Sequence, residues 1–173
     1  MNNLITSAEF ATFRNISQKI DVRKIDEAIS LAQQSDLVDL LGDFYFDVLK
    51  NKDDDTYSVL MHGGDFTYED DEYTHAGIKS ILADFTYARY IYSINVNLTP
   101  FGAVKKEMNQ SSNVERNTLK DLAKQSQIDG GNKFKFTRLY LLSNPTLFSR
   151  FAENKCKRGE DTGFISNKIT KIC

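Results

Sequence analysis

Apolar residues recur at helical spacing through the middle of this chain. At about 100° per residue, one stripe beginning at Ile78 takes in Ile81, Leu82, Phe85, Ala88 and Tyr92. The other side of the same segment is apolar as well, with Ala83, Tyr87, Tyr90, Ile91 and Ile94. The pattern predicts a helix that begins near Gly77 and ends before Pro100, because the residue before a proline is pushed out of helical dihedrals. Two apolar sides require two covers, which the helix's own domain or a neighbouring subunit can supply.

The N-terminal part of the chain predicts two helices. Thr6 and Glu9 form a capping-box pattern that starts a short helix through about Phe13, which offers Phe10 and Phe13 to the core. Asp21 caps a longer helix over residues 22–41. Its apolar stripe drifts at Leu37 and Leu41, which predicts a kink or restart near Ser35. Gly42 can end this helix in the left-handed conformation.

Further helices are predicted on either side of the central segment. Residues 43–49 are short and aromatic and favour one or two helical turns. Ser112 with Glu115 makes a second capping-box pattern, followed by a helix over about 114–128. Gly130 and Gly131 are expected to interrupt it, because glycine weakens a helix interior. A helical pattern then resumes until Pro145, and residues 146–151 can add a last turn.

Residues 52–73 differ in character, with eight acidic side chains. Residues 57–61 and 65–68 are short β-prone runs on either side of the pair Gly63 and Gly64, which predicts a hairpin. The predicted fold class is therefore mainly α: a helical bundle with a small β-hairpin insertion and an extended C-terminal tail. We expect one helical domain over residues 1–152, with the acidic insertion at 52–73, and a basic tail over residues 153–173.

Charge is distributed unevenly over the 173 residues. The net charge is -2, but the part from Lys133 onwards carries nine Lys and Arg against three acidic residues, a balance of +6. The first 132 residues therefore carry -8. A basic C-terminal part suits either nucleic acid or an acidic protein surface, and its spacing leaves both possibilities open.

The composition excludes several classes of protein. No window reaches the roughly 18 apolar residues that span a bilayer, and the N-terminus lacks a secretory pattern, so we expect a soluble protein made in a cytoplasm without membrane partners. Cys156 and Cys173 have no nearby histidine and cannot complete a four-ligand zinc site, so free thiols are expected. No cofactor is expected.

Candidate catalytic residues do not form a complete set. The run from His62 to Gly64 resembles the glycine-rich oxyanion segment of esterases, but the chain has no Gly-x-Ser-x-Gly elbow. His75 is expected to be structural at a helix entry. The acidic runs 53–55 and 69–72 lack the calcium-loop pattern and are better explained as solvated charge or as a surface that steers a basic partner. With phosphate-binding glycine motifs also absent, we do not expect an enzyme.

Two segments resemble the head-tail connector proteins of tailed bacteriophages, the neck adaptor or head-completion family. Residues 25–42 are similar to that family's early helix, which ends in Leu-Gly before a short aromatic helix. Residues 75–105 are most similar to neck-ring proteins of the podovirus-type crAss-like phages. Together the resemblance covers roughly residues 20–150, and its motifs are packing and turn residues rather than an active-site signature.

The resemblance implies a virion structural protein without catalysis. Such proteins form a ring, about dodecameric in this family, that joins the portal protein to further neck or tail ring proteins in the virion neck. They are assembled in the cytoplasm of the bacterial host, and the genomic DNA passes through the channel without sequence-specific binding. The acidic insertion and the long basic tail depart from simpler members of the family.

Two surfaces are candidates for assembly contacts. Surplus apolar positions on the central helix place Tyr87, Tyr90 and Ile94 at or near a subunit boundary. The resemblance implies that a terminal tail embraces the portal, and the candidate docking residues there are Lys155, Lys157, Arg158, Phe164, Lys168 and Lys171. The alternative is a nucleic-acid-associated packaging or regulatory protein that uses the basic C-terminal region. Phe134 and Phe136, among Lys133, Lys135 and Arg138, fit such basic-plus-stacking composition.

Overall fold

The computed structural model describes residues 3–15, 21–93, 96–99, 102–105 and 116–151. Its elements in chain order are α1 (Ser7–Phe13), α2 (Val22–Ala32), the π-helical turn η1 (Gln33–Leu37), α3 (Val38–Leu41), α4 (Phe44–Lys50), α5 (Asp55–His62), β1 (Gly64–Tyr68), β2 (Asp71–His75), α6 (Gly77–Ser93), β3 (Val96–Thr99), β4 (Gly102–Lys105) and α7 (Arg116–Ser143). The predicted fold class, mainly α with a small β-hairpin, is confirmed.

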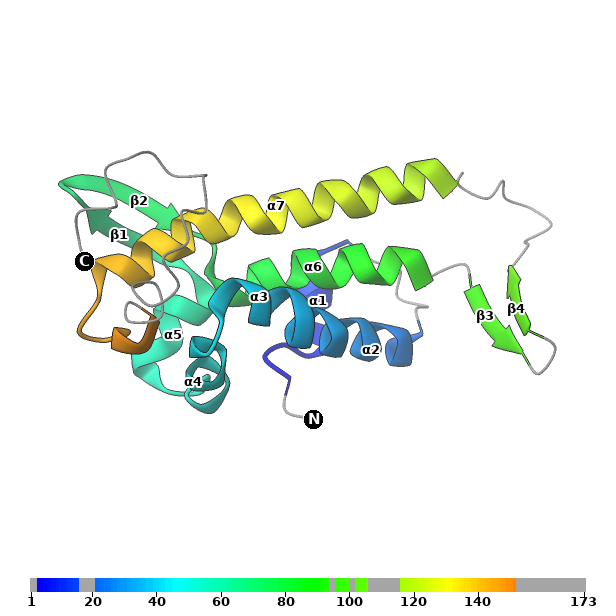
Figure 1. Ribbon diagram of the computed structural model, residues 1–173, viewed down its shortest axis with the longest axis horizontal. Helices are drawn as coiled ribbons and strands as arrows, with labels where there is room; N and C mark the ends of the chain where they lie inside the picture. The colour runs from blue at the N-terminus through cyan, green and yellow to red at the C-terminus, as the bar shows by residue number, and fades with distance from the viewer. Residues whose placement is uncertain (1–2, 16–20, 94–95, 100–101, 106–115, 152–173) are drawn as a thin grey trace.

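The architecture is a long antiparallel helix pair with shorter helices packed against one side (Figure 1). α6 lies in the middle, between α7 on one side and α2 on the other. The hairpin β1–β2 lies at one end of the pair, and β3–β4 lies beyond the other end. The molecule is therefore elongated, with a β-hairpin at each end.

α6 has the two apolar sides that the sequence predicts, and eleven of its residues are buried. Both covers come from the chain itself, because α2 and α7 pack on opposite sides of this helix. Tyr92 is an exception: it was expected on the core face, but it is 54% exposed. The reason is its position in the last turn of α6, which ends at Ser93.

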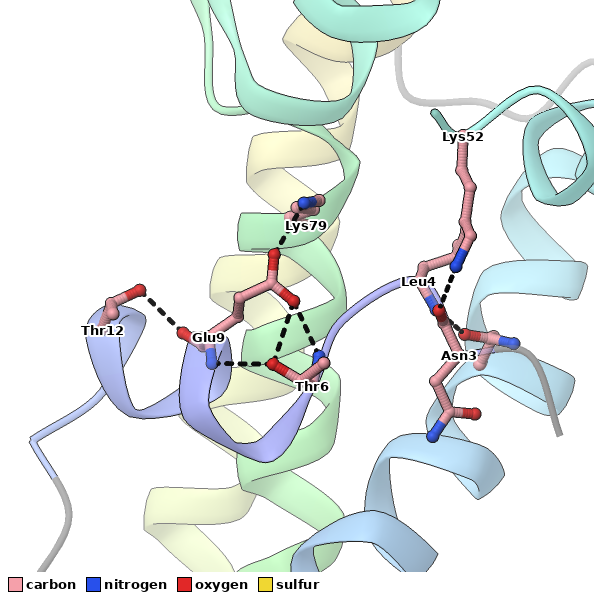
Figure 2. Close-up of polar contacts among 8 residues, drawn as sticks. Asn3, Leu4, Thr6, Glu9, Thr12, Lys52 and Lys79 are labelled. Carbon is pink, nitrogen blue, oxygen red and sulfur yellow. Dashed lines mark hydrogen bonds and ion pairs between the residues drawn. The ribbon is translucent and has the colours of Figure 1, made fainter. Parts of the chain in front are cut away.

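The predicted capping box at the start of α1 is confirmed (Figure 2). The backbone N–H of Glu9 donates to Thr6 Oγ1 at 3.1 Å, and the N–H of Thr6 donates to Glu9 Oε2 at 2.9 Å. The other oxygen of Glu9 accepts a 2.7 Å hydrogen bond from Lys79 of α6, which lowers the pKa of Glu9. Phe10 is fully buried, whereas Phe13, also expected in the core, is 40% exposed at the helix end.

The restart predicted near Ser35 is the π-helical turn η1. A π-helical turn holds more residues than an α-helical turn, so it shifts the phase of everything that follows. This shift returns Leu37 and Leu41 to the core, where they are 0% and 2% exposed. Gly42 ends α3 with φ 58° and ψ -140°, a positive φ as predicted but outside the left-handed helical region.

The acidic insertion contains a hairpin, but its strands differ from the prediction. Residues 57–61, expected as a strand, belong to helix α5, which Asp54 caps by accepting from the N–H of Thr56. The hairpin pairs β1 with β2 and turns at Glu69 and Asp70, both with positive φ. The β-prone composition was outweighed by the helix cap and by the burial of Leu60 and Met61 against the core.

Gly63 and Gly77 lie where two backbones cross. Their φ angles are 91° and 76°. A Cβ on Gly77 would come within 2.4 Å of the Gly63 nitrogen, and a Cβ on Gly63 within 2.5 Å of the His75 carbonyl oxygen. Only glycine allows this close approach between the end of α5 and the start of α6.

α7 is continuous through Gly130 and Gly131, so the predicted interruption is wrong. At Gly130 the helix lies directly against α6, and a Cβ there would be 3.1 Å from the ring of Phe85. Packing against α6 thus outweighs the low helix propensity of glycine. The second predicted capping box, Ser112 with Glu115, lies outside the described residues.

Beyond α6 the chain forms a second hairpin, β3–β4, for which no strands were predicted from the sequence. Residues 149–151 are helical, as predicted for the end of the domain. Phe148 and Phe151 there pack edge-on against Phe44 of α4, closing the core at this end.

Candidate interaction surfaces

A charged cluster lies at the centre of the helix pair, around Asp84 of α6. The Asp84 side chain is 2% exposed and ion-paired with Arg14, which follows α1, and with Lys133 of α7 at 2.9 Å. Arg14 also donates to Ser126 Oγ at 3.0 Å, and Ser126 donates to the backbone carbonyl of Asp84 at 2.9 Å. A buried carboxylate paired with two cations joins α1, α6 and α7, and these ion pairs give it a structural role.

His75 is a second buried polar residue, and it lies at the junction of β2 and α6. Its ring is buried and stacks on Tyr140 of α7 with a centroid distance of 4.4 Å, and Phe66 packs against it edge-on. Neither ring nitrogen has a hydrogen-bond partner among the described residues. Burial lowers the pKa of His75, which favours the neutral ring. Its contacts are those of a core residue, and a structural role was expected from the sequence.

The π-helical turn η1 takes part in another ion pair. Arg89 of α6 donates to both oxygens of Asp36, at 2.6 and 2.9 Å, and this hydrogen bonding raises the pKa of Arg89. The pair is bidentate and half-buried. It fixes η1 against the C-terminal half of α6.

The candidate interface residues on α6 do not share one environment. Tyr90 is 5% exposed and belongs to the chain's own core, so it has almost no surface left for a second subunit. Tyr87 is half-buried, and the guanidinium of Arg14 lies 5.0 Å from its ring centre. Ile94 lies outside the described residues. Assignment of this group to a subunit boundary stays a prediction, with Tyr87 as its better-placed described member.

The candidate docking residues in the tail, from Lys155 to Lys171, lie outside the described residues, as do Cys156 and Cys173. The basic and aromatic residues that suggested nucleic-acid binding do not form one surface in the fold. Phe134 is 7% exposed in the core, and Lys133 is committed to Asp84. Phe136 remains 45% exposed beside Tyr73.

Acidic side chains gather at the tip of the β1–β2 hairpin. Glu69, Asp70, Asp71 and Glu72 are all exposed, and we call these four residues the acidic turn. The hairpin residues Asp65 to Thr67 and Glu72 to Thr74 also line a shallow hollow of about 540 Å³. Within the described part of the chain, no group of three or more His, Cys, Asp or Glu side chains is arranged to hold a metal ion.

Sequence reasoning missed the outer face of α7. Lys120, Lys124 and Lys135 are exposed there, and Arg138 is half-buried. Their spacing at 100° per residue would have shown that these residues share one face of a helix. The predicted break at Gly130 and Gly131 instead assigned them to two different helices. Of the helices the structure describes, none combines the length and apolar character needed to cross a membrane.

The described residues form a mainly α fold with two small β-hairpins. A family model described as "Family of unknown function (DUF6712)" matches residues 37–160, and the chain belongs to this family. The match includes α4 to α7 and both hairpins. No curated protein and no solved structure matches the chain.

Proposed function

We propose that the protein is a non-catalytic virion adaptor that forms a neck ring between the portal protein and the tail of a bacteriophage. The ring, about dodecameric, would extend the channel through which genomic DNA passes. The proposal rests first on the resemblance of residues 25–42 and 75–105 to head-tail connectors.

The structural observation that supports the proposal best is the elongated helix pair with a hairpin at each end (Figure 1). A ring subunit has to contact two identical neighbours through two different surfaces, and it also contacts proteins above and below the ring. An elongated chain with distinct ends provides such separate surfaces. Among the described residues each hairpin is a sheet of only two strands, and an outer strand edge can accept a partner's strand.

The rigid body needed for such an adaptor comes from the core around α6. The Asp84 cluster joins α1, α6 and α7, and the Arg89–Asp36 pair joins α6 to η1. These contacts fix the helices against one another, which suits a spacer between stacked rings.

The decisive experiment is electron microscopy of the full chain mixed with its portal protein. The expected result is a ring of this protein stacked coaxially on the portal ring. Deletion of residues 153–173 is expected to abolish portal docking, because that basic tail is the proposed portal contact. Docking that is unchanged by the deletion would refute the tail contact, and the absence of any ring on the portal would refute the adaptor function.

A nucleic-acid-associated role is the second candidate, and the exposed cations on α7 are the described feature that favours it. Binding of a short labelled duplex that weakens steeply with salt would support this role, because cations on phosphates release counterions. The net charge of -8 on the first 132 residues argues against nucleic-acid binding, because it repels phosphates.

A further inference from the structure

Four cations share one face of α7. At about 100° and 1.5 Å per residue, Lys120, Lys124, Lys135 and Arg138 fall within about 60° of one another over about 27 Å of helix. We call these four residues the α7 basic stripe. Asp121 and Asp129, the acidic residues of this helix, lie outside that sector.

Gly131 lies in the middle of the stripe, and no contact with another described residue explains its lack of a side chain. A Cβ on Gly131 would meet nothing within 4 Å, whereas a Cβ on the neighbouring Gly130 would press on Phe85 and Asp84. Glycine in a helix interior is destabilising relative to alanine. A helix surface without a side chain between two pairs of cations is suited to the close approach of another backbone.

Arg138 gives the stripe an unsatisfied charge. It is half-buried, burial lowers its pKa, and no hydrogen bond or ion pair joins it to another described residue. A guanidinium that has lost water without gaining a partner favours an incoming carboxylate. Lys120 and Lys124 are exposed and likewise without an ion pair among the described residues.

The same chain carries a complementary group in the acidic turn, whose four side chains are exposed. The turn cannot reach the stripe of its own chain, because Phe66 and Tyr73 of the hairpin pack on Tyr140 and Phe136 of α7. At 100° per residue those two aromatic residues lie on the side of α7 opposite the stripe.

We infer that the α7 basic stripe binds the acidic turn, residues 69–72, of a second copy of this chain. The contact is heterologous: each copy offers its stripe to one neighbour and its turn to another, so repetition gives a ring if the rotation closes. A second copy fits better than nucleic acid, since a chain with net charge -2 repels a polyanion while its two complementary surfaces attract each other. The inference deepens the proposed adaptor function and rests on it for the closure of the ring.

Charge reversal on the full chain tests the contact by sedimentation velocity at low ionic strength. The wild type is expected to self-associate in a salt-sensitive way. Lys120→Glu with Lys124→Glu, and separately Asp70→Lys with Asp71→Lys, should each weaken association at least tenfold. Mixing these two variants in equal amounts should restore association with the variants alternating, because each variant's stripe then meets a turn of opposite charge on the other variant. Thr118→Glu with Gln125→Glu adds charge to exposed α7 positions outside the stripe and should have little effect.

Gly131→Leu is the steric test. It should weaken association without lowering the thermal midpoint of the isolated chain, because the position is open. A wild type that stays monomeric at millimolar concentration, or association unaffected by both reversals, would overturn the inference. Duplex DNA binding that is lost on stripe reversal, with self-association unchanged, would overturn it in favour of nucleic acid.

The outcomes separate this inference from the adaptor function. Portal-bound rings that survive both reversals would overturn the contact and leave the adaptor function standing. Self-association that follows the charge swap would support the contact even if no ring forms on the portal, in which case only the adaptor function fails.

Discussion

At the scale of single residues, His75 and Asp84 show two ways in which a polar group is buried in this protein. Asp84 has two cationic partners, while His75 has aromatic neighbours and no hydrogen bond among the described residues. Charge is therefore tolerated at Asp84 and excluded at His75. The two positions should respond differently to substitution.

Protonation of His75 should destabilise the fold. Because burial lowers its pKa in the folded chain, the unfolded chain binds a proton more readily, with an ordinary pKa of about 6.5. The contribution to stability is complete above about pH 6.5 and is lost as the pH falls below that value toward the folded-state pKa. Urea unfolding at pH 7.5 and pH 5 should show this loss in the wild type, and His75→Phe should remove the His75 part of it. His62→Gln, at an exposed position, serves as the control; an equal loss in His75→Phe would contradict the assignment.

Asp84→Asn should destabilise the chain by about 2–4 kcal/mol, because it leaves Arg14 and Lys133 without their shared counter-charge. Asp47→Asn is the matched control. Its 2.8 Å pair with Arg150 is more exposed, so the expected loss is less than about 1 kcal/mol. Equal losses by chemical denaturation would show that burial of the Asp84 cluster has no special energetic weight.

Gly77→Ala should be among the most damaging single substitutions in the chain. The residue has a φ of 76°, and a Cβ would be 2.4–2.6 Å from the backbone of residues 61–63. Backbone atoms cannot yield like a flexible side chain, so we expect a loss of more than about 3 kcal/mol. Thermal unfolding of the purified variant measures the loss, and a midpoint close to that of the wild type would disprove the backbone-crossing interpretation.

At the scale of elements, α7 shows how packing overrides local propensity. Gly130 and Gly131 predicted a break, but contact with α6 keeps the helix continuous across both residues. η1 shows the opposite case, since the drift of the apolar stripe near Ser35 was visible in the sequence and became a π-helical turn.

Substitution of the two glycines of α7 should affect stability differently. Gly131→Ala should stabilise the isolated chain by about 0.5–1 kcal/mol, because alanine is the better helix former and the site is open. Gly130→Ala gains the same propensity but forces its Cβ against Phe85, which is 8% exposed in the core, so we expect no gain or a loss. Thermal unfolding of both variants under identical conditions measures the difference; a similar gain at both positions would mean that the α6–α7 contact yields easily.

At the scale of the whole molecule, the β3–β4 hairpin should contribute little to the stability of the isolated chain. The described core lies around α6, and the β3–β4 hairpin lies beyond the ends of the helix pair (Figure 1). Replacement of residues 95–115 by a flexible linker should therefore leave thermal unfolding of the isolated chain nearly unchanged. It should impair ring formation with the portal if the far end of the molecule contributes a ring contact. A large drop in the thermal midpoint would instead place this hairpin among the core-stabilising elements.

The mainly α class, the capping box at Thr6 and Glu9, the restart near Ser35 and the two-sided central helix could all be predicted from the sequence. These features depend on interactions between near neighbours or on the periodicity of one segment, which a sequence states directly. Long-range packing was needed to establish that α2 and α7 cover both sides of α6, that residues 57–61 are helical and that α7 runs through its glycines. It also decided that Asp84 meets Arg14 and Lys133, and that four cations share one side of α7. These features depend on contacts between segments that are distant in the sequence. The packing energy of such contacts exceeds the small differences in local propensity that a sequence pattern records.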